Sequence, residues 1–214
     1  MPADERVNAM TKVLGLTGGI ASGKSTVSRY LKSLNIPIVD ADLIAREVMR
    51  AGTPTVSKIA ETFGEEYLLA DGEVDRKRLG TTIFNDPAKR QLLNDIVQDE
   101  IRHEILTTKE ALMAEAHPLI VLDIPLLFEE QYETIVDEVL VVFVDKKTQI
   151  ERLLNRNTEL SKAEALQRIE AQLPLEETAK HADILIDNNG TVEETLTQVN
   201  TWLKTNFGDE FIKE

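Results

Sequence analysis

Residues 18–25 read Gly-Gly-Ile-Ala-Ser-Gly-Lys-Ser and match the Walker A pattern G-x-x-x-x-G-K-[ST] in full. A short apolar run, Val13–Leu16, precedes them, and a segment with apolar residues at helical spacing follows. In a strand–loop–helix unit, the backbone N–H groups of such a loop surround a phosphate chain, and the helix N-terminus adds its positive dipole end. The stretch therefore predicts an α/β fold with a nucleotide-phosphate site after its first strand.

The residue types of this loop suit phosphate binding. Gly18 and Gly23 allow the backbone to turn and to approach a ligand closely. Lys24 can reach the β- and γ-phosphates, and the Ser25 hydroxyl can ligate Mg²⁺. The residues expected to bind the nucleotide are Gly19, Ile20, Ala21, Ser22, Gly23, Lys24, Ser25 and Thr26.

Composition and charge narrow the classes of protein. The chain has 214 residues and no cysteine, which excludes disulfides, a thiolate zinc site and a cysteine nucleophile. Its length predicts one domain with a full core and room for a small insertion. The formal net charge of −14 argues against a nucleic-acid partner, because phosphate contacts need a surplus of Lys and Arg. A polyanionic substrate would require positive charge to be gathered locally.

The sequence also bears on location and assembly. No apolar stretch is long enough to span a bilayer, so no membrane partner is expected. Residues 1–9 lack the apolar core of a secretory signal, and we interpret them as a disordered tail or a cloning remnant. A cytoplasmic location is the default expectation. The oligomeric state stays open, with a monomer favoured.

Five short apolar runs separated by helical patterns predict a five-stranded, doubly wound parallel sheet flanked by helices. Three later helices are expected to begin with capping boxes, at Thr148, Ser161 and Thr191. The last helix is expected to pack through one apolar stripe. The predicted strands are Val13–Thr17, Pro37–Asp40, Leu119–Ile124, Val139–Val144 and Ile184–Asp187, and the stripe is Val192, Leu196, Val199, Leu203 and Phe207.

The interval between the second and third predicted strands is too long for a plain crossover, which needs about a dozen residues. It is strongly helical, with apolar stripes at Val56–Phe63 and Leu93–Ile105. We predict a nucleotide-binding core of residues 10–47 and 118–214, interrupted by a helical, acceptor-binding insertion of residues 48–117. Structural helices with no substrate role are the alternative.

Three aspartates lie at or just beyond the carboxyl ends of predicted strands, at the edge where α/β enzymes bind ligands. Asp40 and Asp42 could divide general-base and positioning roles, although helix capping is the alternative for both. Asp123 ends an apolar run in the form of a Walker B element and would hold Mg²⁺ directly or through water. Leu126 belongs to an apolar lip after it, for which an ordinary turn is equally acceptable.

Several polar residues are candidates for contacting anionic groups. Arg152 and Arg156 lie four apart on one expected helix, within a lid at about 150–175 that could cover a transferring phosphoryl group. Ion pairing with Glu151 or Glu159 is the alternative. Arg76 opens a basic cluster that could contact a phosphorylated acceptor or simply face solvent. Asn188 lies in a turn after the last strand that could touch an adenine.

Four motifs in order resemble the dephospho-coenzyme A kinase family: Leu16–Val27, Val39–Asp42, Asp123–Glu129 and Asp187–Gly190. The resemblance runs from about Thr11 to the last helix. It implies a P-loop kinase fold and ATP-dependent phosphorylation of the ribose 3′-hydroxyl of dephospho-CoA, which gives CoA and ADP in the last step of CoA synthesis, with Mg²⁺.

The resemblance also implies roles for particular residues. Asp42 corresponds to the proposed base, Arg156 to the lid arginine, Asn188 to the adenine-side loop and Arg76 to an acceptor-side position; Asp40 and Leu126 are placed with the acceptor. The chain departs from the family pattern at three places. Ala21 stands where the family usually has Gly, and alanine is tolerable there if the φ of this residue is negative. Asn157 stands in place of a common Asp, and Gln98-Asp99 stands in place of a His-Pro pair.

Three other classes of protein are alternatives to this interpretation. Another small-molecule P-loop kinase, such as a nucleoside or nucleoside monophosphate kinase, is the main alternative. A regulatory GTPase would need an N-K-x-D signature, and a transport ATPase would need L-S-G-G-Q; neither occurs in the sequence. The Asp187–Gly190 match to D-x-x-G follows the last predicted strand and is taken as coincidence.

Overall fold

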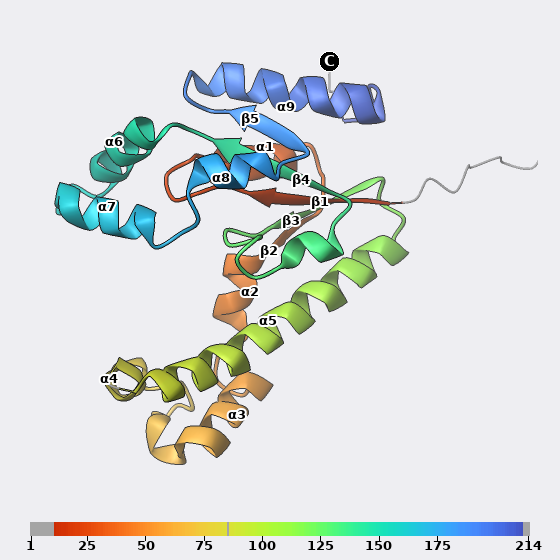
Figure 1. Ribbon diagram of the computed structural model, residues 1–214. Coiled ribbons are helices and arrows are strands. Elements are labelled where there is room, and N and C mark those ends of the chain that lie inside the picture. The colour runs from red at the N-terminus through yellow and green to blue at the C-terminus, as the bar shows by residue number, and fades with distance from the viewer. Residues whose placement is uncertain (1–10, 85, 212–214) are drawn as a thin grey trace, which may run out of the picture. The chain divides into compact units, whose positions relative to one another are not determined.

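A computed structural model of the chain describes residues 11–84 and 86–211 (Figure 1). The predicted tail at residues 1–9 lies outside the described residues. The described residues form two compact units, one of residues 11–39 and 112–211 and the other of residues 40–84 and 86–111. Within the described part, no helix has the length and apolar content needed to cross a membrane.

The first unit is built on the predicted sheet, whose strand order is β2-β3-β1-β4-β5. The register of β1 with β3, of β1 with β4 and of β4 with β5 is parallel. All five predicted strands are confirmed, with ends that differ by at most one residue. They are β1 (Lys12–Thr17), β2 (Ile38–Asp40), β3 (Leu119–Asp123), β4 (Glu138–Phe143) and β5 (Ile184–Asp187).

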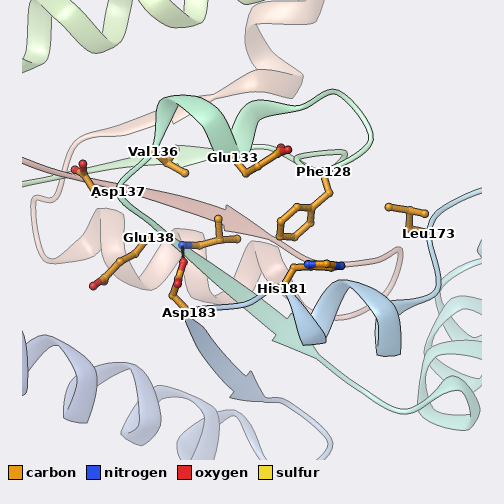
Figure 2. A pocket seen from close by; sticks show the side chains of 9 residues that line it. Phe128, Glu133, Val136, Asp137, Glu138, Leu173, His181 and Asp183 are labelled. Carbon is orange, nitrogen blue, oxygen red and sulfur yellow. Dashed lines mark hydrogen bonds between the residues drawn. The ribbon is translucent and has the colours of Figure 1, made fainter.

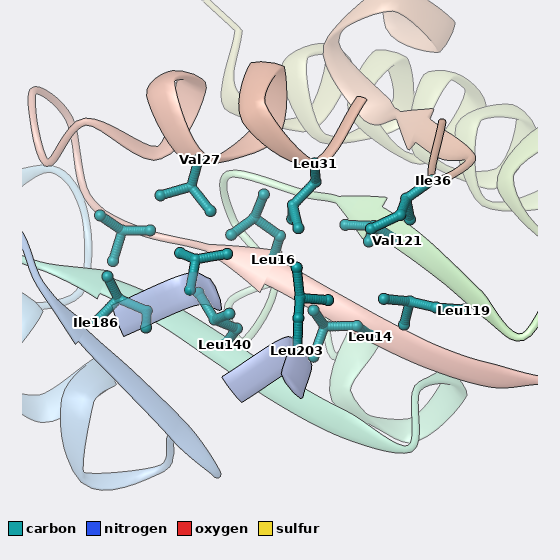
Figure 3. Packing of buried hydrophobic residues seen from close by; sticks show 12 residues of the cluster. Leu14, Leu16, Val27, Leu31, Ile36, Leu119, Val121, Leu140, Ile186 and Leu203 are labelled. Atoms are coloured by element: carbon teal, nitrogen blue, oxygen red, sulfur yellow. The ribbon is translucent and has the colours of Figure 1, made fainter. Parts of the chain in front are cut away.

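Two helices, α1 (Lys24–Ser33) and α9 (Val192–Phe207), contribute to the main apolar core of this unit (Figure 3). Val199 and Leu203 of α9 are fully buried, as the predicted stripe requires. The prediction that Val192 belongs to the packed stripe is wrong, because this residue is 55% exposed at the first turn of the helix. The buried position there belongs to Thr195, whose hydroxyl donates to Asn188 Oδ1 at 2.6 Å. A hydrogen bond to a buried amide therefore replaces an apolar contact at this end of α9.

The remaining helices of the first unit are α6 (Lys146–Arg156), α7 (Lys162–Glu170), α8 (Leu175–Lys180) and the 3₁₀ turn η2 (Tyr132–Ile135). The capping boxes predicted at Ser161 and Thr191 are confirmed. The one predicted at Thr148 is wrong, because α6 begins earlier. Asp145 caps it by accepting the Thr148 N–H at 2.7 Å, so Thr148 lies inside the first turn.

The Thr191 cap gives a testable pH dependence. The Thr191 N–H and hydroxyl donate to the Glu194 carboxylate and hold the pKa of that carboxyl below its ordinary value of 4.5. A depressed folded-state pKa contributes stability above pH 4.5 that is lost as pH falls through the folded-state pKa. We expect Glu194→Gln to lower the free energy of unfolding at pH 7 and to flatten its fall in acid, measured by urea unfolding. Glu193→Gln removes the same charge beside the cap. In this variant the free energy of unfolding should fall with decreasing pH as steeply as in the wild type.

The second unit is helical. It contains α2 (Ala41–Glu47), α3 (Pro54–Phe63), the 3₁₀ turn η1 (Glu65–Tyr67), α4 (Arg76–Phe84) and most of α5 (Pro87–Ala114). Its own core forms around Val56, Ile59, Val74 and Leu79, with Leu93 packed against them. The predicted α3 stripe and the Leu93 end of the α5 stripe therefore face an apolar cluster. Gly64, with φ of 116°, ends α3 where an L-residue would be strained.

Candidate active site

The Walker A residues form the connection between β1 and α1 (Figure 1). A Cβ on Gly18 would lie 2.8 Å from the Val142 carbonyl oxygen, which leaves no room for a side chain. Gly23 has φ of 93°, and a Cβ there would collide with Asn188 Nδ2. Both glycines are thus required by close backbone packing, and the loop has the conformational freedom predicted for it.

Ala21 adopts φ of 61°, so the negative φ that would make alanine tolerable without strain is not present. The left-handed conformation costs an L-residue roughly 1–2 kcal/mol. The Ala21 methyl packs against the apolar cluster formed by Leu153, Ala165 and Ile169 of α6 and α7, together with neighbouring Ile20. Burial of the methyl offsets part of the backbone cost, which explains how alanine is accommodated in place of glycine.

The structure brings Lys24 and Asp123 into direct contact. The Lys24 ammonium forms an ion pair with the Asp123 carboxylate, and only 15% and 8% of the two side chains are exposed. Parallel pairing aligns Leu16 with Asp123, which carries the carboxylate to the end of β1 where the loop begins. The Walker A lysine and the predicted Walker B aspartate therefore share one partly dehydrated location.

The donors available for a cation at this loop suit Mg²⁺. Among the described residues, no group of three or more His, Cys, Asp or Glu side chains could hold a metal ion. The candidates are the exposed Ser25 hydroxyl and the Asp123 carboxylate. Mg²⁺ commonly binds through one or two protein oxygens, with phosphate and water oxygens completing its shell. The chemistry of this small oxygen set fits that ion when it arrives with a nucleotide.

Asn188 supports the loop from the side of β5. Its Nδ2 donates to the Ser22 carbonyl at 2.7 Å, and its Oδ1 accepts from the Thr195 hydroxyl. Its own N–H donates to the Phe143 carbonyl at 2.8 Å. The residue is 5% exposed, so both ends of its side chain are engaged within the protein. Asn188 therefore holds the loop in place, and its predicted contact with the nucleotide stays a prediction.

The two arginines of α6 have different surroundings. The Arg152 guanidinium donates to the Asn188 carbonyl at 2.8 Å, which connects α6 to the loop support. Arg156 is exposed at the end of α6, and its Nε lies 3.4 Å from Asn157 Oδ1. Across residues 11–84 and 86–211, neither arginine forms an ion pair with Glu151 or Glu159, which was the alternative interpretation. The Arg156 guanidinium is therefore available for an anionic ligand.

The two aspartates at the carboxyl end of β2 also differ. Asp40 caps α2 by accepting the Leu43 N–H at 3.0 Å, so capping describes Asp40 correctly. Asp42 lies in the first turn of α2 and is exposed, and no hydrogen bond or ion pair of its carboxylate is found in the described part of the chain. An exposed, uncommitted carboxylate is suited to accept a proton from a ligand.

Arg76 and Arg78 begin α4, and the structure separates their roles. Arg78 donates to the Glu66 carbonyl at 2.7 Å, and its guanidinium lies 5.2 Å from the centre of the Tyr67 ring. Arg78 thereby fixes η1 against α4. Arg76 is exposed and remains the candidate for an anionic acceptor. Leu126 is half-buried in the segment after β3, where the Thr17 hydroxyl donates to the Pro125 carbonyl.

Sequence reasoning missed two glutamines that contact the loop. Gln149 Nε2 donates to the Ile20 carbonyl at 2.8 Å, and the Ile20 N–H donates to Gln172 Oε1 at 2.8 Å. Neither residue belongs to a recognisable motif, and both are far from the loop in sequence. No local pattern could have identified them.

A separate hollow of about 430 Å³ is lined by residues at the amino ends of β4 and β5 and by Phe128, Leu173 and His181 (Figure 2). Phe128 and His181 form part of its wall. Asp137 and Asp183 also line it, but their carboxylates accept the Val13 and Val139 N–H groups. These aspartates therefore complete the ends of the strands.

Comparisons with known proteins agree with this geometry. A sequence model of the dephospho-CoA kinase family matches residues 12–194. The chain is 52% identical to dephospho-CoA kinase of Bacillus cereus over 195 residues, which cover 91% of this chain and 97% of the relative. It is 51% identical to that of Enterococcus faecalis over 199 residues, covering 93% and 99%.

Solved structures give the same result. Dephospho-CoA kinase from Campylobacter jejuni superposes with a TM-score of 0.71 at 28% identity, covering 94% of this chain and all of that one. A Thermus thermophilus protein, TT1252, gives a TM-score of 0.74 at 31% identity, covering 91% and 97%. The fold is that of a P-loop kinase, and the chain belongs to the dephospho-CoA kinase family.

Proposed function

We propose that this chain transfers the γ-phosphoryl group of ATP to the ribose 3′-hydroxyl of dephospho-CoA, giving CoA and ADP in the last step of CoA synthesis. The observation that carries the proposal is the complete phosphate loop with Lys24 paired to Asp123, in a chain that belongs to this family. The cytoplasmic location and the monomeric state expected from the sequence are part of the proposal.

Residues 19–26 would enclose the phosphates of ATP and would bind them through backbone N–H groups other than that of Ile20, which donates to Gln172 Oε1. Lys24 would exchange part of its contact with Asp123 for the β- and γ-phosphates, which places its charge where negative charge shifts during transfer. Ser25 and Asp123 would hold Mg²⁺, which neutralises phosphate charge when bound. Arg152 would act through its bond to Asn188, which fixes the loop.

Asp42 would serve as the general base. The acceptor 3′-oxygen forms a bond to the γ-phosphorus while the bond between that phosphorus and the bridging oxygen to the β-phosphate breaks, and the 3′-hydroxyl proton passes to Asp42. The free Asp42 carboxylate supports this assignment, because the neighbouring Asp40 carboxylate is committed to the α2 cap. Arg156 would stabilise the transferring group from the lid at about 150–175.

The acceptor would be held by the helical segment proposed at residues 48–117, together with Asp40 and Leu126. An acidic protein must gather positive charge to bind a diphosphate, and Arg76 is an exposed cation available for that purpose. The length of the helical segment supports a large acceptor, since the pantetheine arm of dephospho-CoA offers much more surface than a mononucleotide does.

The proposal is tested by coupling ADP release to an optical assay with Mg-ATP and dephospho-CoA as the only acceptor. We expect ADP release that depends on dephospho-CoA, and a product whose new phosphate is on the ribose 3′-oxygen by phosphorus NMR. ADP release that is unchanged by adding dephospho-CoA would overturn the proposed function, as would a phosphate at another position.

A further inference from the structure

We infer that Gln149 and Gln172 are positioning residues that fix the P-loop backbone at Ile20 and thereby connect the loop to both ends of the α6–α7 segment. The inference rests on the proposed function, since it concerns how that loop is kept ready for ATP. Its basis is two hydrogen bonds that use both backbone groups of one loop residue.

The two bonds have opposite polarity. Gln172 Oε1 accepts the Ile20 N–H at 2.8 Å, whereas Gln149 Nε2 donates to the Ile20 carbonyl at 2.8 Å. Gln149 is 4% exposed, so water cannot readily replace its amide. A Cβ on Gly19 would lie 2.8 Å from Gln149 Nε2, which shows how closely the glutamine packs on the loop. Each glutamine thus satisfies one of the two backbone groups of Ile20.

The positions of the two glutamines define what the bonds connect. Gln149 lies on α6 and Gln172 follows α7, so the segment between them contains the proposed lid arginine, Arg156. The same segment supplies the apolar cluster of Leu153, Ala165 and Ile169, against which the Ile20 side chain also packs. Ile20 is therefore held to α6 and α7 by its backbone and its side chain together.

This arrangement has a consequence for binding and for catalysis. The N–H groups of a P-loop must keep one direction to bind phosphates, and a loop free to rotate at Ile20 would lose that direction. Because the same bonds hold the α6–α7 segment, the position of Arg156 depends on them too. Loss of either bond should weaken ATP binding and also lower turnover at saturating ATP.

The opposite polarities permit a test by the same substitution at both positions. A glutamate carboxylate only accepts hydrogen bonds. Gln172→Glu keeps an acceptor for the Ile20 N–H, whereas Gln149→Glu places an acceptor against the Ile20 carbonyl. Gln167→Glu, at an exposed position of α7, adds the same charge to the same segment and serves as the matched control.

The measurement is the Kd for Mg-ATP by isothermal titration calorimetry, with folding checked by thermal unfolding. An unsatisfied buried carbonyl should weaken binding by about tenfold or more in Gln149→Glu. Gln172→Glu and Gln167→Glu should stay within about threefold of wild type, and Gln172→Leu, which has no acceptor, should lose about fivefold or more. Gln172→Glu should thus retain the affinity for Mg-ATP that Gln172→Leu loses. Gln149→Met, which fits a buried site and lacks a donor, replaces Gln149→Glu if the charged variant does not fold.

Several outcomes would contradict the inference. Equal weakening by Gln149→Glu and Gln172→Glu would mean that added charge, not bond polarity, is responsible. Wild-type affinity and turnover in both Gln149→Met and Gln172→Leu would mean that the bonds do not position the loop. ATP affinity does not depend on the acceptor, so the expected affinity pattern in an enzyme inactive toward dephospho-CoA would overturn the proposed function while leaving this inference intact.

Discussion

Replacing Lys24 by methionine should reduce turnover of ATP by about 10²–10³-fold, because an electrostatic donor aimed at the transferring phosphates is lost. Methionine keeps the apolar stem of the side chain. It also leaves Asp123, whose side chain is 8% exposed, without its partner, so the melting temperature should fall. Turnover must therefore be expressed per folded molecule, with the folded fraction taken from thermal unfolding at the assay temperature.

Lys12→Met is the matched control for this experiment. Lys12 lies at the other end of β1, where its ammonium pairs with Glu138 at 2.7 Å. The same substitution there removes a lysine ion pair without touching the loop, and it should leave turnover near the wild-type value. A folded Lys24→Met enzyme within about threefold of wild-type turnover would remove Lys24 from the phosphate site, since loss of such a donor typically costs far more.

Asp42→Asn should lower kcat by about 10²–10⁴-fold, the usual contribution of a general base, with little change in the melting temperature. Its exposed carboxylate makes no contact within residues 11–84 and 86–211 that stabilises the fold. The asparagine cannot accept the proton of the acceptor hydroxyl at neutral pH. The measurement is kcat at saturating ATP and dephospho-CoA, with thermal unfolding alongside.

Asp40 supplies the comparison, because it shares the helix and caps it. Asp40→Asn keeps a good capping side chain and should retain most of kcat, whereas Asp40→Ala should cost about 1 kcal/mol of stability through the lost cap. If Asp40→Asn lost turnover and Asp42→Asn did not, Asp40 would be the base and the assignment of Asp42 would be wrong.

Local sequence patterns predicted the features that depend on local chemistry. The strands, the Walker A loop and the capping boxes at Ser161 and Thr191 follow from hydrophobic runs and short-range hydrogen bonds, and all were confirmed. The capping box predicted at Thr148 was wrong for a local reason too. Asp145, three residues earlier, is an equally suitable cap and begins the helix.

Features that depend on long-range contacts could not be predicted in this way. Ala21 adopts a positive φ that its side chain disfavours, and the packing that offsets the cost comes from α6 and α7. Gln149 and Gln172 contact backbone atoms of Ile20, and a backbone group carries no sequence signal for a partner more than a hundred residues away. Val192 was wrongly assigned to the buried stripe of α9. Helical periodicity cannot show that the buried position one turn later belongs to Thr195, whose hydroxyl bonds to Asn188.

The identity of the acceptor is the central claim, and the specificity constant tests it most directly. On one enzyme preparation with Mg-ATP, kcat/KM should be compared for dephospho-CoA, adenosine, AMP and UMP. Binding energy from the pantetheine arm and the diphosphate is available in the transition state only when those parts are present, so truncated acceptors should lose turnover as well as affinity. We predict efficient phosphorylation of dephospho-CoA, poor phosphorylation of adenosine and hardly any of AMP or UMP. A higher kcat/KM for AMP or UMP than for dephospho-CoA would contradict the account and identify a nucleoside monophosphate kinase.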